Sequence, residues 1–411
     1  MPILLEEDLR RPLPRMYRVR QQFDETRLED VAGTVRAELA KPEIRALVKP
    51  GMRIAVGVGS RGIQNLYTIV ETTVNSLKEL GAEPFIVSAM GSHGGGTEEG
   101  QREVLAGYGI TEERLGVPVV TTVDTVYLGN CANGRPVWFD RAAYEADLIV
   151  PINRVKLHTD FVGPIQSGLC KMLVIGLGNH KGCSAVHEEA PEVFADAIEE
   201  TARLILQKAP VGFGIAILEN AYDKTYAVEA VPAEHLVERE KELVQIAKGN
   251  MPYIMLDEAD VIVCGAIGKD ISGAGFDPNI LGRSSVLKQF VLHIPRYQRL
   301  VLCDVTPASH GNGIGVGLFD VITKKVAEQL DLESMYANAI ACNCLGDASV
   351  PCTVDDEETA IRVALKCCRN IDRDHPRIIR IQNTLHLGEI EVSEALLDAV
   401  RADPRMSLIE N

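Results

Sequence analysis

The chain has 411 residues, of which 46% are hydrophobic and 24% charged, and its formal net charge at pH 7 is -16. This composition is typical of soluble globular proteins, and the length favours two domains over a single core. The acidic balance argues against a general nucleic-acid-binding surface, because phosphate binding needs clustered Lys and Arg.

The first residues of the chain and its cysteines indicate the cellular compartment. Residues 1–8 are acidic and contain no long apolar run, so we predict no secretory signal. No apolar stretch reaches the roughly 20 residues that span a bilayer. The ten cysteines are scattered, and most are expected to be reduced thiols. We therefore expect a cytoplasmic protein that binds neither nucleic acid nor membrane.

Hydrophobic patterning predicts strands that alternate with helices after an irregular, Arg- and Pro-rich lead-in of about 25 residues. The expected strands are residues 53–58, 83–88, 147–151, 211–218, 260–266, 300–305 and 377–381. The expected helices are residues 66–80, a helix from Thr97, and residues 191–208, 235–248, 318–330 and 357–368. This alternation is typical of mostly parallel, doubly wound sheets.

The domain boundary is expected near Gly249-Asn-Met-Pro252, a turn-rich break after a charged helix. We therefore predict two doubly wound α/β domains, residues 1–250 and 251–411. Ligands of such sheets bind at the carboxyl ends of strands. Arg61, His93 and His158 each follow a predicted strand within a few residues, so they are expected to converge on one crevice.

The loop Gly91-Ser-His-Gly-Gly-Gly-Thr97 joins a predicted strand to a predicted helix. Gly94 and Gly95 belong to a run of three glycines after His93, and this bare backbone lets a ligand approach closely. The helix start, which the Thr97 hydroxyl is expected to cap, favours an anion. A tight turn with a surface histidine is the alternative, but the pattern favours a general acid/base at an anion-binding loop.

Residues 153–187 are the most informative stretch of the chain. Lys171 lies in an almost wholly apolar run, where a lysine is either snorkelling or desolvated and nucleophilic. His187 is a candidate metal ligand, and His180 competes with it. His158 taken alone is more typical of a solvated strand-end histidine.

As a set, these positions resemble the nickel-pincer-nucleotide-dependent lactate racemase family of hydroxyacid racemases and epimerases. The resemblance covers roughly residues 50–190. In the family a histidine precedes a Ser-Gly-x-x-Lys motif, and here His158 precedes Ser167-Gly-Leu-Cys-Lys171. The family's nickel-binding histidine follows sixteen residues after that lysine, and His187 matches it.

Two further positions look like family residues. His93 stands before Thr97-Glu-Glu99, as a histidine does at the corresponding strand end of the family. Arg61 looks like the family arginine that faces the substrate carboxylate in an Asp-x-Thr-Arg loop, although the aspartate is missing here. In segment 268–278, Lys269 persists from the family pattern, whereas the Gln and second Lys that touch lactate do not.

The resemblance implies a racemase or epimerase that inverts the hydroxyl-bearing carbon of a 2-hydroxy acid or sugar acid. It implies that Lys171 carries the nickel-pincer nucleotide covalently, that His187 binds nickel, and that two histidines, His93 and His158, act as acid and base. The other residues that it assigns to cofactor binding are Gly94, Gly95, Ser167 and Gly168. Arg61 and Lys269 are assigned to the substrate.

These roles imply that domain 1–250 carries the cofactor and catalytic residues, while domain 251–411 closes the substrate site in the cleft between them. The expected partners are a small hydroxy acid and the proteins that make the nickel-pincer cofactor. An oligomer is possible. Because the lactate-binding Gln and Lys are lost, the substrate is expected to differ from lactate, for example a larger hydroxy acid or an aldonate.

Two other functions remain open at this point. The same basic crevice would suit a nickel-independent, metal-dependent lyase or hydratase that acts on a sugar acid. It would also suit a non-catalytic protein that binds an anionic metabolite.

Overall fold

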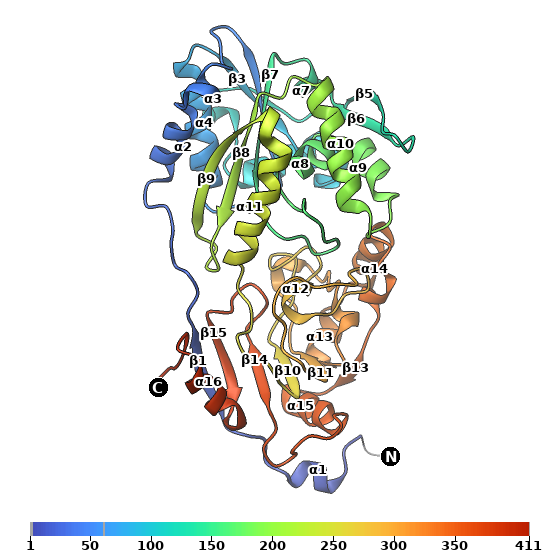
Figure 1. Ribbon diagram of the computed structural model, residues 1–411. Coiled ribbons are helices and arrows are strands. Elements are labelled where there is room, and N and C mark those ends of the chain that lie inside the picture. Colours follow the sequence, from blue (N-terminus) through green and yellow to red (C-terminus); the bar gives the residue numbers. More distant parts are fainter. Residues whose placement is uncertain (1–2, 61, 411) are drawn as a thin grey trace. The chain divides into compact units, whose positions relative to one another are not determined.

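The computed structural model describes residues 3–60 and 62–410 and forms two compact units, each an α/β structure (Figure 1). One unit comprises Glu25–Met251 and is called the 25–251 unit below. The other comprises Pro252–Asn411 together with Met1–Asp24 and is called the 252–411 unit.

The first 24 residues differ from the sequence-based expectation, which made them an irregular part of the N-terminal domain. They contain a short helix, α1 (Glu6–Arg10), and a strand, β1 (Met16–Gln21). Strand β1 pairs antiparallel with β15 (Glu389–Ser393) and β16 (Met406–Leu408), which joins it to the 252–411 unit. The partners of β1 lie more than 360 residues away in the sequence, so no local pattern predicts this pairing.

The 25–251 unit is built on a six-stranded sheet in the order β4-β3-β2-β7-β8-β9, parallel except for the antiparallel pair β8–β9. Its strands are β2 (Arg53–Val58), β3 (Glu83–Ser88), β4 (Val119–Val120), β7 (Leu148–Arg154), β8 (Phe213–Glu219) and β9 (Thr225–Pro232). A separate hairpin consists of β5 (Thr125–Asn130) and β6 (Pro136–Asp140).

The helices of this unit are α2 (Val31–Leu39), α3 (Pro42–Arg45), α4 (Leu66–Glu79), α5 (Glu98–Gly107), α6 (Glu112–Leu115), α7 (Arg141–Tyr144), α8 (Leu169–Lys171), α9 (Asn179–His187), α10 (Phe194–Lys208) and α11 (Leu236–Asn250). A π-helix, Met172–Gly176, continues α8, and short 3-10 turns lie at Gly94–Gly96 and Ala233–His235.

The two faces of this sheet are packed differently. On one face, Ile54, Val56 and Val58 of β2 join a core with buried side chains of α2 and α4, blue in Figure 1. The other face has small residues, and a Cβ on Gly214 would lie 2.6 Å from a methyl carbon of Leu169 in α8. The glycine therefore lets α8 pack directly onto the sheet, where it also contacts α10 and α11.

Several local predictions are confirmed. Strands β2 and β3 have the predicted bounds, and α4 ends just before Gly81, whose φ of 84° is the left-handed conformation of a glycine C-cap. The Thr97 hydroxyl accepts from Gly100 N at 3.1 Å and caps α5 as predicted.

The predicted helix 318–330 is wrong in its first half. That half contains β12 (Val321–Thr323), and only Lys324–Gln329 forms a helix, α13. Val321, Ile322 and Thr323 are β-branched and buried, a combination that suits a sheet interior better than a helix.

The 252–411 unit contains an eight-stranded mixed sheet in the order β13-β12-β11-β10-β14-β15-β1-β16. The first five strands run parallel, and the last three pair antiparallel. The remaining elements are β10 (Val261–Cys264), α12 (Pro278–Leu281), β11 (Arg299–Leu302), α14 (Leu332–Ala341), β13 (Cys352–Val354), α15 (Glu357–Lys366), β14 (Ile378–Ile381) and α16 (Leu397–Ala402), with 3-10 turns at Pro307–Ser309, Val316–Leu318, Leu345–Ala348 and Glu394–Leu396.

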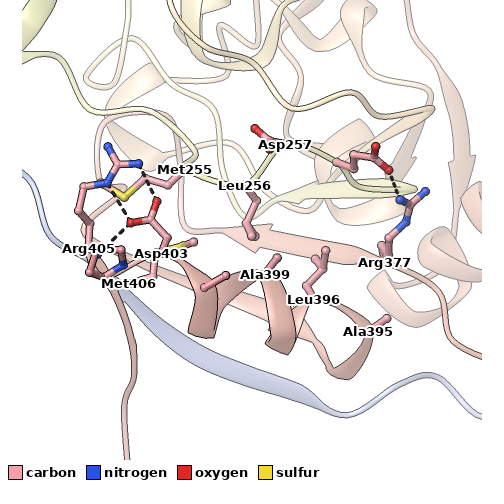
Figure 2. Close-up of a pocket in the computed structure, with 13 residues that line it drawn as sticks. Met255, Leu256, Asp257, Arg377, Ala395, Leu396, Ala399, Asp403, Arg405 and Met406 are labelled. Atoms are coloured by element: carbon pink, nitrogen blue, oxygen red, sulfur yellow. Dashed lines mark hydrogen bonds and ion pairs between the residues drawn. The ribbon is translucent and has the colours of Figure 1, made fainter.

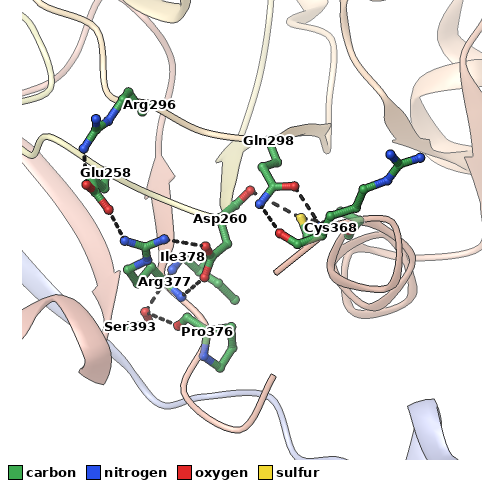
Figure 3. Close-up of polar contacts among 11 residues, drawn as sticks. Glu258, Asp260, Arg296, Gln298, Cys368, Pro376, Arg377, Ile378 and Ser393 are labelled. Atoms are coloured by element: carbon green, nitrogen blue, oxygen red, sulfur yellow. Dashed lines mark hydrogen bonds and ion pairs between the residues drawn. The ribbon is translucent and has the colours of Figure 1, made fainter. Parts of the chain in front are cut away.

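Ionic contacts hold the start of the central strands of this unit (Figure 3). Arg377 Nη2 donates to the buried Asp260 carboxylate at 2.9 Å, and Arg377 and Arg296 both donate to Glu258. The Ser393 hydroxyl donates to Pro376 O at 2.7 Å and accepts from Ile378 N at 2.9 Å. These contacts join β14 to β10 and β15.

A pocket of about 760 Å³ opens in the same unit (Figure 2). Leu256, Leu396 and Ala399 are among its apolar lining residues. Its two arginines are both paired with acids, Arg377 with Glu258 and Arg405 with Asp403. Among the described residues, none of the predicted site residues lines this pocket.

In the described part of the chain, no helix combines the length and the apolar character that crossing a membrane would require.

Candidate functional site

Three neighbouring strands of the 25–251 unit, in the order β3-β2-β7, end in loops that carry candidate residues. Their carboxyl ends lie at one edge of the sheet because the strands are parallel. Ser60 follows β2 and hydrogen-bonds through Oγ to Nδ1 of His93, which follows β3. Arg61 lies outside the described residues.

The His93 loop is held against the π-helix. Gly91 N donates to Gly176 O at 3.0 Å, and Gly91 adopts a φ of 60°. Gly94 has a φ of 65°, and a Cβ there would lie 2.6 Å from the backbone of Gly100 and Gln101. A side chain at Gly94 is therefore excluded by both conformation and space, whereas a Cβ on Gly95 would meet nothing within 4 Å.

A backbone bridge brings the loop after β7 beside the Lys171 segment. Lys156 and Ser167 exchange two backbone hydrogen bonds of 3.0 and 3.1 Å. The Asn153 side chain donates to Gly168 O at 2.8 Å. As a result, His158 Nε2 and Lys171 Nζ, thirteen residues apart, are hydrogen-bonded to each other.

Two contacts hold the His158 ring, and a third holds its backbone. Its Nδ1 accepts from Asp160 N at 3.0 Å, and its ring stacks on Phe161 with 4.3 Å between centroids and 27° between planes. The His158 backbone N–H donates to Gln166 Oε1 at 2.8 Å, and Gln166 is buried. These contacts leave Nε2 directed at Lys171.

Behind Lys171, a buried carboxylate contacts the start of α8. Glu240 of α11 is inaccessible to solvent, and its Oε2 accepts from Cys170 N at 2.8 Å. A Cβ on Gly168 would lie 2.5 Å from the Glu240 carboxyl carbon, so the glycine makes room for this carboxylate. Burial raises the pKa of Glu240 to about 7, although hydrogen bonds from Cys170 and Leu169 oppose the shift.

His187 stands near the end of α9, four residues after Cys183. Its Nδ1 lies 2.7 Å from Cys183 O and 3.5 Å from Cys183 Sγ. A carbonyl oxygen only accepts, so Nδ1 carries the proton and Nε2 keeps the lone pair that a metal would use. The ring packs edge-on against Phe194 at 5.1 Å.

Cys183 and His187 shift each other's protonation. Burial acts to raise the pKa of Cys183, but the hydrogen bond and positive charge of His187 outweigh it, and the net pKa is lowered. Desolvation acts to lower the pKa of His187, but the contacts with Cys183 outweigh it, and the net pKa is raised. Lys171 acts electrostatically on both groups, which places all three in one electrostatic neighbourhood.

A metal held by protein ligands alone would need more donors than this segment offers. Within residues 3–60 and 62–410, no three His, Cys, Asp or Glu side chains gather as a metal site. A single imidazole, His187, fits a metal whose other ligands come from a bound cofactor. His180, the competing candidate, lies on the same helix, and both histidines are exposed.

Lys269, assigned to the substrate from the sequence, lies in the 252–411 unit. Its Nζ donates to Gly273 O at 2.7 Å and to the side-chain oxygen of Asn338.

Cys183, Ser60 and Glu240 were missed by sequence reasoning. Cys183 could have been found from the sequence, because it lies four residues before His187 and residues four apart share a helix face. Glu240 had none, since it lies about 70 positions along the chain from the lysine helix that it contacts.

Comparison with known proteins gives a family match to part of the chain and a similar fold. Residues 13–196 match the family model of the lactate racemase N-terminal domain. The lactate racemase apoprotein from Thermoanaerobacterium thermosaccharolyticum is 13% identical with a TM-score of 0.52, over 89% of this chain and 93% of that chain. A protein from Thermotoga maritima is 13% identical with a TM-score of 0.50, over 80% of this chain and 85% of that chain. No curated protein matches the chain.

Proposed function

We propose that the chain is an isomerase, because residues 13–196 match the family model of the lactate racemase N-terminal domain and the fold is similar to that of a lactate racemase apoprotein. It would invert the hydroxyl-bearing carbon of a 2-hydroxy acid or a sugar acid. The observation that carries the proposal is the pairing of Lys171 with His158 at the sheet edge where His93 also lies.

The residues present fit the nickel-pincer nucleotide that the family implies. Lys171 would hold it covalently, since its side chain is only partly buried and its Nζ contacts the His158 imidazole. His187 would bind nickel through Nε2, which its Nδ1 contact with Cys183 O orients. When bound, the cofactor would supply the chemistry that takes a hydride from the substrate carbon and returns it.

The chain itself would handle protons. His93 and His158 come from loops after two different strands, and each would take or give the hydroxyl proton of one enantiomer. The Ser60 hydroxyl contacts Nδ1 of His93 and would orient the ring for this proton exchange. Gly94 and Gly95 would let the ligand approach the backbone, while Ser167 and Gly168 shape the turn that presents the lysine.

The residues proposed for substrate recognition come from the sequence resemblance. Arg61 would anchor the substrate carboxylate through a bidentate contact. Lys269 remains a sequence-based candidate for the same role. The missing lactate-binding Gln and Lys support a substrate other than lactate.

The proposal is tested on protein co-expressed with the enzymes that make the nickel-pincer cofactor. We expect an intact-mass adduct that maps to Lys171, stoichiometric nickel, and inversion of at least one acid in a chiral screen of 2-hydroxy acids. The Lys171→Ala variant should fold normally but lose the adduct.

Three outcomes would contradict the proposal. An adduct that persists in Lys171→Ala would remove the lysine from its role. Activity with another metal and no nucleotide would favour the lyase or hydratase. Thermal stabilisation by an acid without any turnover of the loaded protein would favour a binding protein.

A further inference from the structure

Two phenylalanines connect the two histidines that the proposed function assigns to proton transfer and to nickel. The His158 ring stacks on Phe161, with 4.3 Å between centroids and 27° between planes. The Phe161 ring lies 4.8 Å from that of Phe194 at 45°, and Phe194 meets the His187 ring edge-on at 5.1 Å and 62°. These four rings, called the ring chain below, form one continuous series of contacts.

The middle of the ring chain lies in the interior, whereas its two ends reach solvent. Phe161 is 2% exposed and Phe194 is 7% exposed. His158 is partly exposed and His187 is exposed. Interior side chains are packed about as densely as the molecules of an organic crystal, so a change in one buried ring displaces its neighbours. A change at one end of the ring chain is therefore expected to reach the other end.

The loop that carries Phe161 packs directly on the start of α10. A Cβ on Gly163 would overlap the Cβ of Ala195, the second residue of that helix. The buried Gln166 side chain donates to Gly163 O at 3.2 Å and accepts from His158 N at 2.8 Å. The same loop therefore holds the His158 backbone and brings Phe161 against the first turn of α10.

A buried arginine holds the other half of the ring chain. Arg135 of the β5–β6 hairpin pairs with Glu189, which follows α9, and with Glu200 of α10 at 2.8 Å. The chain between His187 and Phe194 is thereby tied to the hairpin and to α10. The end of α9 and the start of α10 are held in one corner, and the two rings stay in contact.

We propose that Phe161 and Phe194 are positioning residues that fix the His158 ring and the His187 ring relative to each other. A phenyl ring has no titratable or metal-binding group, so neither phenylalanine takes part in the chemistry itself. The inference deepens the proposed function and rests on it for the roles of the two histidines. The coupling between their rings does not depend on it.

The proposed reaction explains why the separation of the two histidines matters. The hydroxyl oxygen and the carbon that bears it are adjacent atoms, so the group that exchanges the proton and the residue that holds the metal must serve one small centre. A misplacement of about 1 Å can cost about a hundredfold in rate. A packed pair of phenylalanines keeps this separation without placing another polar group in the site.

The first test uses the unloaded, full-length protein with histidines labelled with 13C at Cε1. The His158 and His187 resonances are assigned by their loss in His158→Gln and His187→Gln. Spectra are recorded at pH 9, about 2.5 units above the ordinary histidine pKa of about 6.5, which limits differences in ring protonation. The diagnostic effect is crosswise, at the histidine that the substituted phenylalanine does not touch.

We expect Phe194→Leu to move the His158 resonance and Phe161→Leu to move the His187 resonance. The matched control is Phe213→Leu, the same substitution at a fully buried phenylalanine in the core around β2 and β8. Each crosswise shift should exceed that caused by Phe213→Leu at least threefold. Crosswise shifts no larger than those of the control would overturn the inference, because the phenylalanines would then only fill the core.

Each of the two variants tests the inference by itself. Cooperative thermal unfolding above the temperature of the measurement shows that a variant is folded. Methionine is flexible and fills irregular gaps in a core, so Phe161→Met or Phe194→Met replaces a leucine variant that does not fold. The crosswise shift expected is the same, because methionine also removes the ring.

The second test measures how fast the loaded protein releases nickel to a chelator. We expect release from Phe161→Leu to be about two- to tenfold faster than from the wild type, the range that the loss of one aromatic pair gives. Phe213→Leu should release nickel at the wild-type rate. Because Phe161 is two contacts away from His187, wild-type release from Phe161→Leu would overturn its part in positioning the nickel ligand.

The inference and the proposed function fail separately. A chain that never takes up the cofactor would contradict only the proposed function, since the spectra of the unloaded protein still report the coupling of the two rings. An active, nickel-loaded enzyme whose His158 and His187 resonances respond independently would contradict only the inference.

Discussion

Burial controls the protonation of Glu240, a single carboxyl group beneath the lysine helix. The side chain is inaccessible to solvent, and burial raises its pKa from an ordinary 4.5 to about 7. One of its oxygens accepts from Cys170 N, while Oε1 has no hydrogen-bond partner among the described residues. A buried charge with so few partners is costly, so the neutral form is favoured in the folded state.

We therefore predict that Glu240 makes the folded state less stable as the pH rises from 4.5 through 7. Between these values the folded chain retains a proton at Glu240 that the unfolded chain has released, so the free energy of unfolding falls with pH. The total change is at most about 3.5 kcal/mol, at about 1.4 kcal/mol per pKa unit. Urea unfolding of the wild type and Glu240→Gln at pH 5 and pH 8 measures it.

The difference between the two proteins isolates Glu240 from other titrating groups. Glu240→Gln introduces an amide whose own cost is the same at both pH values, so only the pH dependence is diagnostic. Stability of the wild type relative to Glu240→Gln should be lower at pH 8 than at pH 5. A constant difference would show that Glu240 is ionised, or neutral, at both values.

At the scale of elements, the π-helix Met172–Gly176 connects the lysine segment to the His93 loop. Its last residue, Gly176, accepts from Gly91 N at 3.0 Å. A Cβ on Gly176 would lie 2.7 Å from both Ala89 O and Met172 Sδ. This close approach of the π-helix to the end of β3 therefore depends on glycine.

We predict that Gly176→Ala lowers the free energy of unfolding by about 1–3 kcal/mol, because the added methyl group forces the π-helix away from β3. The matched control is Gly107→Ala in α5, where a Cβ would meet nothing within 4 Å. That control should be unchanged or more stable by up to about 1 kcal/mol. Equal stability of both variants in chemical denaturation would refute the close packing at Gly176.

At the scale of the whole molecule, a strand from the start of the chain completes the 252–411 unit. Val19 of β1 is fully buried in the core of that unit. The Gln21 side chain donates to Leu387 O at 2.8 Å and accepts from Met255 N at 2.7 Å. The chain therefore starts in the 252–411 unit, forms the whole of the 25–251 unit, and then completes the 252–411 unit.

We predict that Val19→Asp destabilises the 252–411 unit selectively, because it buries a charge between its sheet and helices. Hydrogen exchange of amides in β10 and β15 should rise at least tenfold, while amides in β2 and β3 keep their protection. Arg20→Ala, at a side chain that is 61% exposed, is the control and should change neither unit. Faster exchange in β2 and β3 alone would contradict this division of the chain.

Features that depend on near neighbours could be predicted. The bounds of β2 and β3, the glycine after α4 and the Thr97 cap all follow from patterns within a few residues. The antiparallel strands β1, β15 and β16 escaped prediction, because their partners are distant in the sequence and each strand is short. The helix predicted at 318–330 failed because a buried β-branched triplet was read with a helical period.

By itself, the sequence determined the α/β class and a resemblance to the lactate racemase family, because periodicity and motif spacing are local properties. It also singled out His93, His158, Lys171 and His187 as candidates. Only the tertiary structure decided that His158 meets Lys171, since a backbone bridge closes the thirteen residues between them. The burial of Glu240 was likewise decided there. Protonation depends on which donors and solvent surround a group, and long-range packing sets both.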